Sequence, residues 1–131
     1  MSGIKDLDEL LRSMSPKLME SDFVFCTVSG VLADYVYLNP VATFFEAEGL
    51  TLVLEKSVAQ NAGLPFDAVY SQITLTVHSS LEAIGLTAAV ASKLAAKGIS
   101  ANVIAAFYHD HIFVQQAKAE AAVSALAEFS A

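Results

Sequence analysis

The chain has 131 residues, of which 55% are hydrophobic and 16% charged, and its 14 acidic and seven basic side chains give a formal net charge of −7. Such an acidic chain repels phosphate backbones and anionic lipid, which argues against nucleic acid and membranes as partners. A single cysteine excludes an internal disulfide, and polar residues interrupt each apolar run before it reaches membrane-spanning length.

The high hydrophobic fraction favours a homo-oligomer, such as a dimer, that hides apolar surface between its subunits. The start of the chain, MSGIKDLDEL, lacks the basic and apolar regions of a signal peptide. We therefore expect a cytoplasmic protein, long enough to bury one core or two small halves that share a core.

An amphipathic helix is predicted to open the chain. Apolar residues recur every three or four positions from Ile4 to Leu18, and Asp6 with Glu9 matches a capping box. Pro16 is expected to end or kink this helix.

A strand, a hairpin and a short helix are predicted next. Their ranges are a buried strand at 23–28, a short strand at 34–38, a hairpin of 41–47 and 50–55 around Glu48 and Gly49, and a helix at 57–62. Cys26 lies in the middle of the first strand, where a free thiol serves as core filling rather than as a nucleophile. Glu46 and Glu48 resemble paired catalytic carboxylates, but a solvated hairpin edge explains them better.

The stretch from Ser71 to Gln116 organises the rest of the chain. It predicts a strand at 71–77 with one buried face, a helix capped by Ser79 or Ser80 and ended by Gly98, and an antiparallel hairpin of 100–107 and 112–114. A final helix over 118–129 places Ala119, Ala122, Leu126 and Phe129 on one face to cover the sheet.

This order of elements predicts the split βαβ arrangement of a ferredoxin-like α/β sandwich, an α+β fold. The strand at 71–77 and the strand at 100–107 then run parallel, so their carboxyl ends meet at one end of the sheet. Residues from three segments are expected to come together there and form a polar cluster: His78, Ser79, Ser80, Gly85, Phe107, His109, Asp110 and His111.

A weak internal repeat divides the chain. The segment LTLVLEKSVAQNAG and the segment HIFVQQAKAEAAVS each contain an apolar strand, a few polar residues and a helix. We predict two halves with antiparallel sheets, a divergent one at 1–65 and a second at 66–131.

Several stretches taken together resemble the small bacterial proteins built from two ACT domains. They are EAEGLTLV (46–53), ITL (73–75), LEAIGLTA (81–88), GIS (98–100) and YHDH (108–111). The second half is also similar to the ACT domains of aspartate kinases and of a cytosolic arginine sensor. The resemblance implies a regulatory protein that binds an amino acid or a related small molecule and has no catalytic role.

Site residues are carried over from the same resemblance. ACT domains commonly bind their ligand between two copies, with a strand-to-helix loop from one copy and the start of the second strand from the other. The positions implied here are Glu82, Gly85, Leu86 and Thr87 in the loop, Ile99, Ser100 and Asn102 at the second strand, and Phe107 and Asp110 near the hairpin turn. The resemblance implies no cofactor, and it leaves open whether the site lies within one chain or between subunits.

Alternative interpretations of these residues remain. The backbone amides after Gly85 suit a carboxylate, or Gly85 only allows close packing. Asp110 suits an ammonium or guanidinium group, or it only closes a turn. The three histidines, His78, His109 and His111, would suit zinc in a metal-dependent enzyme, although their spacing is not that of a dedicated site. A purely structural oligomer is a third possibility.

Overall fold

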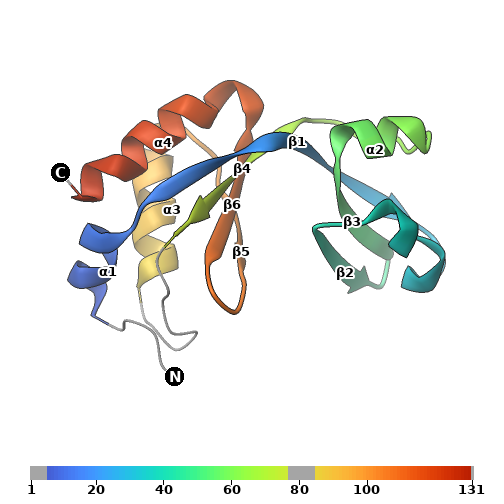
Figure 1. The fold of residues 1–131 in the computed structure, drawn as a ribbon, viewed down its shortest axis with the longest axis horizontal. Coiled ribbons are helices and arrows are strands. Elements are labelled where there is room, and N and C mark those ends of the chain that lie inside the picture. Colours follow the sequence, from blue (N-terminus) through green and yellow to red (C-terminus); the bar gives the residue numbers. More distant parts are fainter. Residues whose placement is uncertain (1–5, 77–84, 131) are drawn as a thin grey trace. The chain divides into compact units, whose positions relative to one another are not determined.

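The computed structural model describes residues 6–76 and 85–130 (Figure 1). The fold is α+β, with six strands in an antiparallel sheet of order β2-β3-β1-β4-β6-β5. Contacts group the chain into two compact units, unit 1 with residues 1–20 and 71–131 and unit 2 with residues 21–70. Strand β1 (Pro16–Val28) contributes its first five residues to unit 1 and the remainder to unit 2. The boundary between residues 65 and 66 stays a prediction about the sequence repeat.

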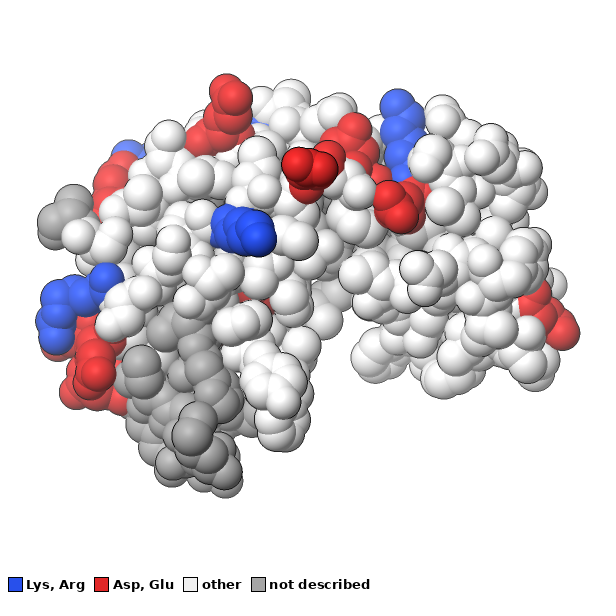
Figure 2. Space-filling model, viewed as in Figure 1, with Lys and Arg blue, Asp and Glu red and all other residues white. Residues whose placement is uncertain are grey.

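Charged side chains are sparse on the surface. The face shown in Figure 2 carries them singly or in small groups separated by wide uncharged areas, as a charged fraction of 16% implies. None of the helices in the described ranges has the length and apolar character needed to cross a membrane.

Unit 1 has the ferredoxin-like arrangement that the sequence predicts. Its elements, besides the start of β1, are α1 (Leu7–Ser13), β4 (Tyr70–Leu75), α3 (Leu86–Ala96), β5 (Asn102–Ala105), β6 (Asp110–Gln115), η3 (Gln116–Lys118), α4 (Ala119–Ala127) and η4 (Glu128–Ser130). Strand β6 lies between β4 and β5, and in an antiparallel sheet the two outer strands therefore run in the same direction. The predicted parallel pair, with a strand folding back between its members, is confirmed.

The core of unit 1 lies between one face of the sheet and the helices. Ile73 and Leu75 of β4 and Ile112 and Val114 of β6 point to that face and are at most 1% exposed. Their helical partners in the same cluster are Leu10, Met14, Leu86, Val90, Leu94, Ala119, Ala122, Ala125 and Leu126. The predicted apolar face of α4 is thus confirmed, with Phe129 packed at the edge of the cluster, and α3 buries an apolar face beside it.

The first helix is shorter than predicted. It ends at Ser13, and Pro16 begins β1, so Leu18 belongs to a strand. A proline disfavours helical geometry in the residue before it, which explains the early end. The start is as predicted, because Asp6 is the N-cap and its Oδ1 accepts a hydrogen bond of 2.9 Å from the backbone N–H of Glu9.

Asp6→Ala should lower the free energy of unfolding by about 1 kcal/mol, because the amide of Glu9 loses its acceptor. Urea unfolding followed by circular dichroism measures this loss. Asp8→Ala is the matched control, since Asp8 lies in the first turn of the helix rather than at its cap. An equal loss in both variants would contradict the assigned cap.

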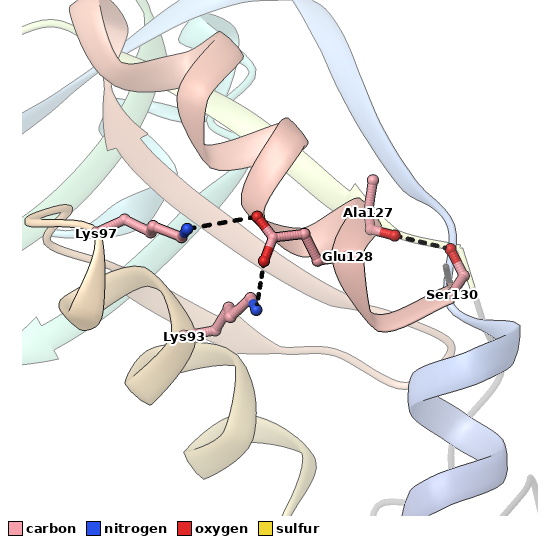
Figure 3. Close-up of polar contacts among 5 residues, drawn as sticks. All are labelled: Lys93, Lys97, Ala127, Glu128 and Ser130. Atoms are coloured by element: carbon pink, nitrogen blue, oxygen red, sulfur yellow. Dashed lines mark hydrogen bonds and ion pairs between the residues drawn. The ribbon is translucent and has the colours of Figure 1, made fainter.

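An ion-pair group joins α3 to the C-terminal end of unit 1 (Figure 3). The carboxylate of Glu128 lies 2.7 Å from Lys93 Nζ and 3.4 Å from Lys97 Nζ. The hydrogen bond and charge of Lys93, followed by the charge of Lys97, hold the pKa of Glu128 below its usual value. All three side chains are solvent-accessible, so this group orients η4 without adding much to stability.

Unit 2 contains the predicted hairpin and helix. Its elements, besides the end of β1, are η1 (Leu32–Asp34), η2 (Val36–Leu38), β2 (Ala42–Glu46), β3 (Gly49–Glu55) and α2 (Lys56–Asn61). Strand β3 pairs antiparallel with β1 and with β2, from Ala42 opposite Val53 to Glu46 opposite Gly49. The short strand predicted at 34–38 is wrong, because this segment forms two 3-10 turns that place Leu38 in the core.

The core of unit 2 is a separate apolar cluster. It contains Val24, Cys26, Leu38, Leu50, Leu52, Leu54 and Ala59. Cys26 is 4% exposed, and burial raises the pKa of its thiol. A buried thiol with a raised pKa is unreactive, which agrees with the prediction that Cys26 is core filling.

Candidate functional site

One end of unit 1 contains the described members of the cluster that the topology predicts. In Figure 1 the carboxyl end of β4, the start of α3 and the turn between β5 and β6 lie at the same end of this unit. Gly85 directly precedes α3, and Asp110 is the first residue of β6. The structure therefore brings Gly85 and Asp110 to one end of the unit, although 25 positions separate them in the sequence. His78, Ser79, Ser80 and Glu82 lie outside the described residues.

Among the described residues, no side chain caps the start of α3. Gly85 is the N-cap residue, with φ at +98°, and its carbonyl accepts the first helical hydrogen bond from Ala89 N–H at 2.8 Å. The backbone amides of the first helical turn, which include those of Leu86 and Thr87, have no acceptor within the helix. Such amides and the helix dipole favour a bound anion. The Thr87 side chain is exposed, whereas the Leu86 side chain is buried in the core.

Gly85 also packs closely against Leu7 of α1. A Cβ at this position would lie 3.1 Å from Leu7 Cδ2 of α1. Both interpretations of Gly85 are therefore compatible with its surroundings, because the glycine allows a positive φ and a close neighbour together.

The second-strand group lies elsewhere in unit 1. Because β5 ends at the turn that precedes Asp110, its first residues lie at the opposite end of the strand. Ile99 is buried, Ser100 is exposed, and Asn102 Nδ2 donates a 3.2 Å hydrogen bond to the carbonyl of Phe113. One chain thus does not bring Ile99, Ser100 and Asn102 together with Gly85 and Asp110.

The β5–β6 turn presents two aromatic rings. Phe107 and Tyr108 are 66% and 63% exposed, and their rings meet edge to face at a centroid distance of 4.9 Å. A 3.0 Å hydrogen bond from Ala106 N–H to the carbonyl of His109 closes the turn. Phe107 therefore stands at the surface beside the segment that carries Asp110.

Asp110 is a buried acid with two histidine neighbours. Its side chain is on the helix-covered face by the alternation of β6, and the residue is only 8% exposed. Burial raises the pKa of its carboxyl group, and the charges of His111 and His109 oppose that rise. A buried carboxylate is costly without a cation, so this position favours a positively charged group nearby.

A hydrogen-bond network occupies the opposite face of β4 and β6. Nδ1 of His111 lies 3.0 Å from Thr74 Oγ1 and 3.2 Å from Gln72 Nε2, and Gln72 Nε2 donates to Thr74 Oγ1 at 3.3 Å. An amide donor beside Nδ1 favours a neutral ring that accepts there. Burial lowers the pKa of His111, His109 lowers it further, and Asp110 opposes them.

This network corrects one prediction and adds one group of residues. The predicted strand at 71–77 was expected to bury one face, but Gln72 and Thr74 on its second face are each 7% exposed. Polar side chains at these positions predict a face exposed to solvent. His111 supplies the hydrogen-bond partner that allows Gln72 and Thr74 to be buried. The signal in the sequence was the two-residue spacing of Gln72 and Thr74 on a strand next to the one that carries His111.

The stability of the protein should fall in mild acid because of His111. Its lowered pKa means that the unfolded chain takes up a proton near pH 6.5 while the folded chain resists it. The free energy of unfolding should decrease as pH falls below that value, by no more than about 1.4 kcal/mol per pH unit for one proton. The raised pKa of Asp110 has the opposite effect, adding stability as pH falls through its folded pKa, above the usual 3.8.

Urea unfolding of wild type and His111→Gln across this pH range measures the effect. The variant should lose most of the dependence around pH 6.5, whereas His109→Gln, the neighbouring control, should keep most of it. Identical pH profiles in wild type and His111→Gln would show that the ring is not held neutral by the fold.

The other two predicted constellations have weak support. Among the described residues no three His, Cys, Asp or Glu side chains are grouped as metal ligands, and the third histidine of the predicted set, His78, lies outside those residues. Glu46 accepts a hydrogen bond from Thr51 Oγ1 on an exposed strand, and Glu48 lies in the hairpin turn, as a solvated edge requires.

Unit 2 has a polar depression of its own. Its volume is about 280 Å³, and its lining residues are Ser21, Asp22, Glu55, Lys56, Ser57 and Gln60. Ser21 Oγ already donates a 2.7 Å hydrogen bond to Glu55 Oε1 across it. The depression is open and shallow, with side chains that are exposed or half-buried, so it is not a preformed ligand pocket.

Comparisons with solved structures show close and distant relatives. A Vibrio cholerae protein of unknown function, described as a possible transport protein, is 65% identical, with a TM-score of 0.89 over 99% of this chain and 100% of that one. A protein from Agrobacterium tumefaciens is 17% identical, with a TM-score of 0.73 over 89% of each chain. The ligand-free regulatory subunit of Thermus thermophilus aspartate kinase shares the fold at 11% identity, with a TM-score of 0.63 over 86% of this chain and 95% of that one. No curated protein matches the chain.

Family comparison covers nearly all of the sequence. One ACT-domain model matches residues 2–71, and a second ACT-domain model matches residues 67–128. The ferredoxin-like topology of unit 1 and the similarity to the aspartate kinase regulatory subunit agree with these matches. The chain therefore belongs to the ACT-domain family and carries two ACT domains in tandem.

Proposed function

We propose that this protein is a non-catalytic regulator that binds an amino acid at the polar end of unit 1. ACT domains typically bind small ligands of this kind for regulation. The observation that carries the proposal is that a helix start without a described side-chain cap, at Gly85, and a buried acid, Asp110, lie at the same end of the unit.

The two groups match the two charges of an amino acid. The amides of Leu86 and Thr87 at the start of α3 suit the carboxylate, which gains hydrogen bonds and the favourable end of the helix dipole. Asp110 suits the ammonium group, whose charge would offset the cost of its buried carboxylate. Phe107 at the adjacent turn offers an exposed ring to cover the ligand side chain.

A complete ACT-type site would need a second copy of the chain. Ile99, Ser100 and Asn102 lie at the far end of β5 from Asp110, so these residues would reach the ligand only from another molecule. This geometry supports a homo-oligomer with ligand sites shared between subunits. It also supplies a route for regulation, since ligand binding would then change subunit contacts.

Thermal-shift measurements with each of the common amino acids test the proposal. The cognate ligand at about ten times its Kd should raise the melting temperature of wild type by about 5 °C. Asp110→Asn should weaken its binding at least tenfold, because a charge-assisted hydrogen bond is worth roughly 1.5–3 kcal/mol. The same variant should not reduce stability, since it removes a buried charge whose pKa is raised.

Asp67→Asn is the matched control, because Asp67 is exposed and lies in unit 2. It should bind the ligand as wild type does. No thermal response to any amino acid in wild type would refute the proposed ligand class. A response that is equal in Asp110→Asn and wild type would refute the proposed site.

A further inference from the structure

Helix α1 meets the start of α3 at the end of unit 1 that carries Gly85. Leu7 is the first residue of α1, and a Cβ on Gly85 would lie 3.1, 3.7 and 3.9 Å from Cδ2, Cδ1 and Cγ of its side chain. In Figure 1 the starts of both helices lie at the same end of the unit as the turn between β5 and β6. Leu7 therefore lies directly beside the helix start that suits the ligand carboxylate.

Leu7 is the outermost residue of an apolar stripe on α1. Leu10 and Met14, three and seven positions further along, are 0% and 2% exposed and belong to the core cluster of unit 1. Leu7 packs against the edge of that cluster but is only half-buried. One part of its side chain thus covers the core, and the remainder is accessible at the end of the unit.

The contact with Gly85 also brings Leu7 close to the free amides of α3. The peptide bond between Gly85 and Leu86 carries one of the amide groups that have no acceptor within the helix. In an amino acid, the carboxylate and the side chain are attached to the same carbon atom. A carboxylate bound at these amides therefore brings the ligand side chain within reach of Leu7.

The neighbours of the site favour an apolar ligand side chain. The helix start and Asp110 bind the carboxylate and the ammonium group, which all amino acids share, so they do not distinguish one amino acid from another. Among the described residues, Leu7 of α1 and the exposed ring of Phe107 offer apolar surface at this end of the unit. Asp8 and Glu9 in the first turn of α1 repel an acidic side chain.

We propose that Leu7 determines ligand specificity at this site, which accepts amino acids with apolar side chains and limits their size through Leu7. This inference rests on the proposed function, because it assigns the ligand class of the same site. In an apolar site, one methylene group more or less changes affinity by roughly 10–200-fold. Changing the size of Leu7 therefore changes which ligand binds best.

Isothermal titration calorimetry of the full chain tests the ligand class. The probes are alanine, valine, leucine and phenylalanine, with asparagine and lysine as polar side chains. The best of the four apolar amino acids should bind wild type at least tenfold more tightly than asparagine or lysine, because a polar group buried against Leu7 and Phe107 lacks a partner.

Two substitutions of Leu7 test its role in opposite directions. The measured quantity is the Kd of phenylalanine divided by the Kd of valine. Leu7→Ala should lower this ratio at least tenfold, because the removed atoms leave room for the larger ligand. Leu7→Phe should raise the ratio, because the added ring takes up space. A loss of stability alone weakens both ligands equally and leaves the ratio unchanged.

Leu11→Ala is the matched control. Leu11 lies one turn further along α1, is half-buried as Leu7 is, and packs against the same core cluster. The three atoms closest to a Cβ on Gly85 all belong to Leu7, so Leu11→Ala should keep the ratio of wild type. Circular dichroism checks that each variant is folded.

The possible results separate this inference from the proposed function. Apolar amino acids that bind wild type with the same ratio in both folded Leu7 variants would overturn the role of Leu7, as would an equal change in Leu11→Ala. Tighter binding of asparagine or lysine than of every apolar probe would overturn the ligand class. No binding of any amino acid would refute the amino-acid site itself, and this inference with it.

Discussion

Leu94→Ala is expected to lower the free energy of unfolding by about 3 kcal/mol. Leu94 is 0% exposed on α3, and it lies in the cluster that joins the helices to β4 and β6. Removing its branched end leaves a cavity that several elements border, and such sites collapse poorly. A loss of this size is a large part of the stability of an ordinary domain. Urea unfolding followed by fluorescence and circular dichroism measures it.

Leu18→Ala makes the same chemical change at a residue of β1 that is 40% exposed. This control should cost less than about 1 kcal/mol, because less apolar area leaves water at that position. Equal losses at Leu94 and Leu18 would mean that the helices do not pack on the sheet as described.

Gly85→Ala should destabilise unit 1 by about 2 kcal/mol. At φ +98° an alanine is strained by roughly 1–2 kcal/mol, and its Cβ would also lie 3.1 Å from Leu7 Cδ2. The neighbouring leucine must shift, which disturbs the contact between α1 and the start of α3. The same urea titrations report this change.

Gly98→Ala measures the cost of backbone strain at a positive φ without a side-chain contact. Gly98 has φ at +75°, and a Cβ there would meet nothing within 4 Å. It should cost about 1 kcal/mol, the conformational part alone. A Gly85→Ala variant that is no less stable than Gly98→Ala would show that the contact with Leu7 has no energetic weight.

Local patterns in the sequence predict most of unit 1. The alternation of Ile73 and Leu75, the apolar stripe of α3 and the positive φ of Gly98 all follow from residue type and spacing. At that C-terminus Ile99 N–H bonds to the Leu94 carbonyl at 2.9 Å, as expected beyond a helix-ending glycine. The parallel relation of β4 and β5 then follows from the handedness and shortness of the connections.

Long-range partners explain what the sequence does not predict. The burial of Gln72 and Thr74 depends on His111, which lies on another strand. The extension of β1 back to Pro16 depends on neighbours in and just after β4, such as Thr76, whose N–H bonds to the Ser15 carbonyl at 2.9 Å. Residues 6–20 belong to unit 1 through such contacts, which no local pattern encodes.

The sequence likewise predicts only part of the candidate site. Sequence position alone places Gly85 and Asp110 at one end of the sheet once the βαβ topology is assumed, and the structure has both at the same end of unit 1. The set of Ile99, Ser100 and Asn102 comes from family resemblance, and the fold places it at the far end of β5. A site that combines both sets therefore depends on subunit association.

Nuclear magnetic resonance mapping of the bound amino acid tests the central claim most directly. With ¹⁵N-labelled protein and the amino acid that gives the greatest thermal shift, the largest amide shift changes should fall at Leu86, Thr87 and Asp110. Ile99 and Ser100 should also respond, because the proposed site takes them from a second copy of the chain. Changes confined to the depression at Asp22, Glu55 and Lys56, with none at Leu86 or Asp110, would contradict the account.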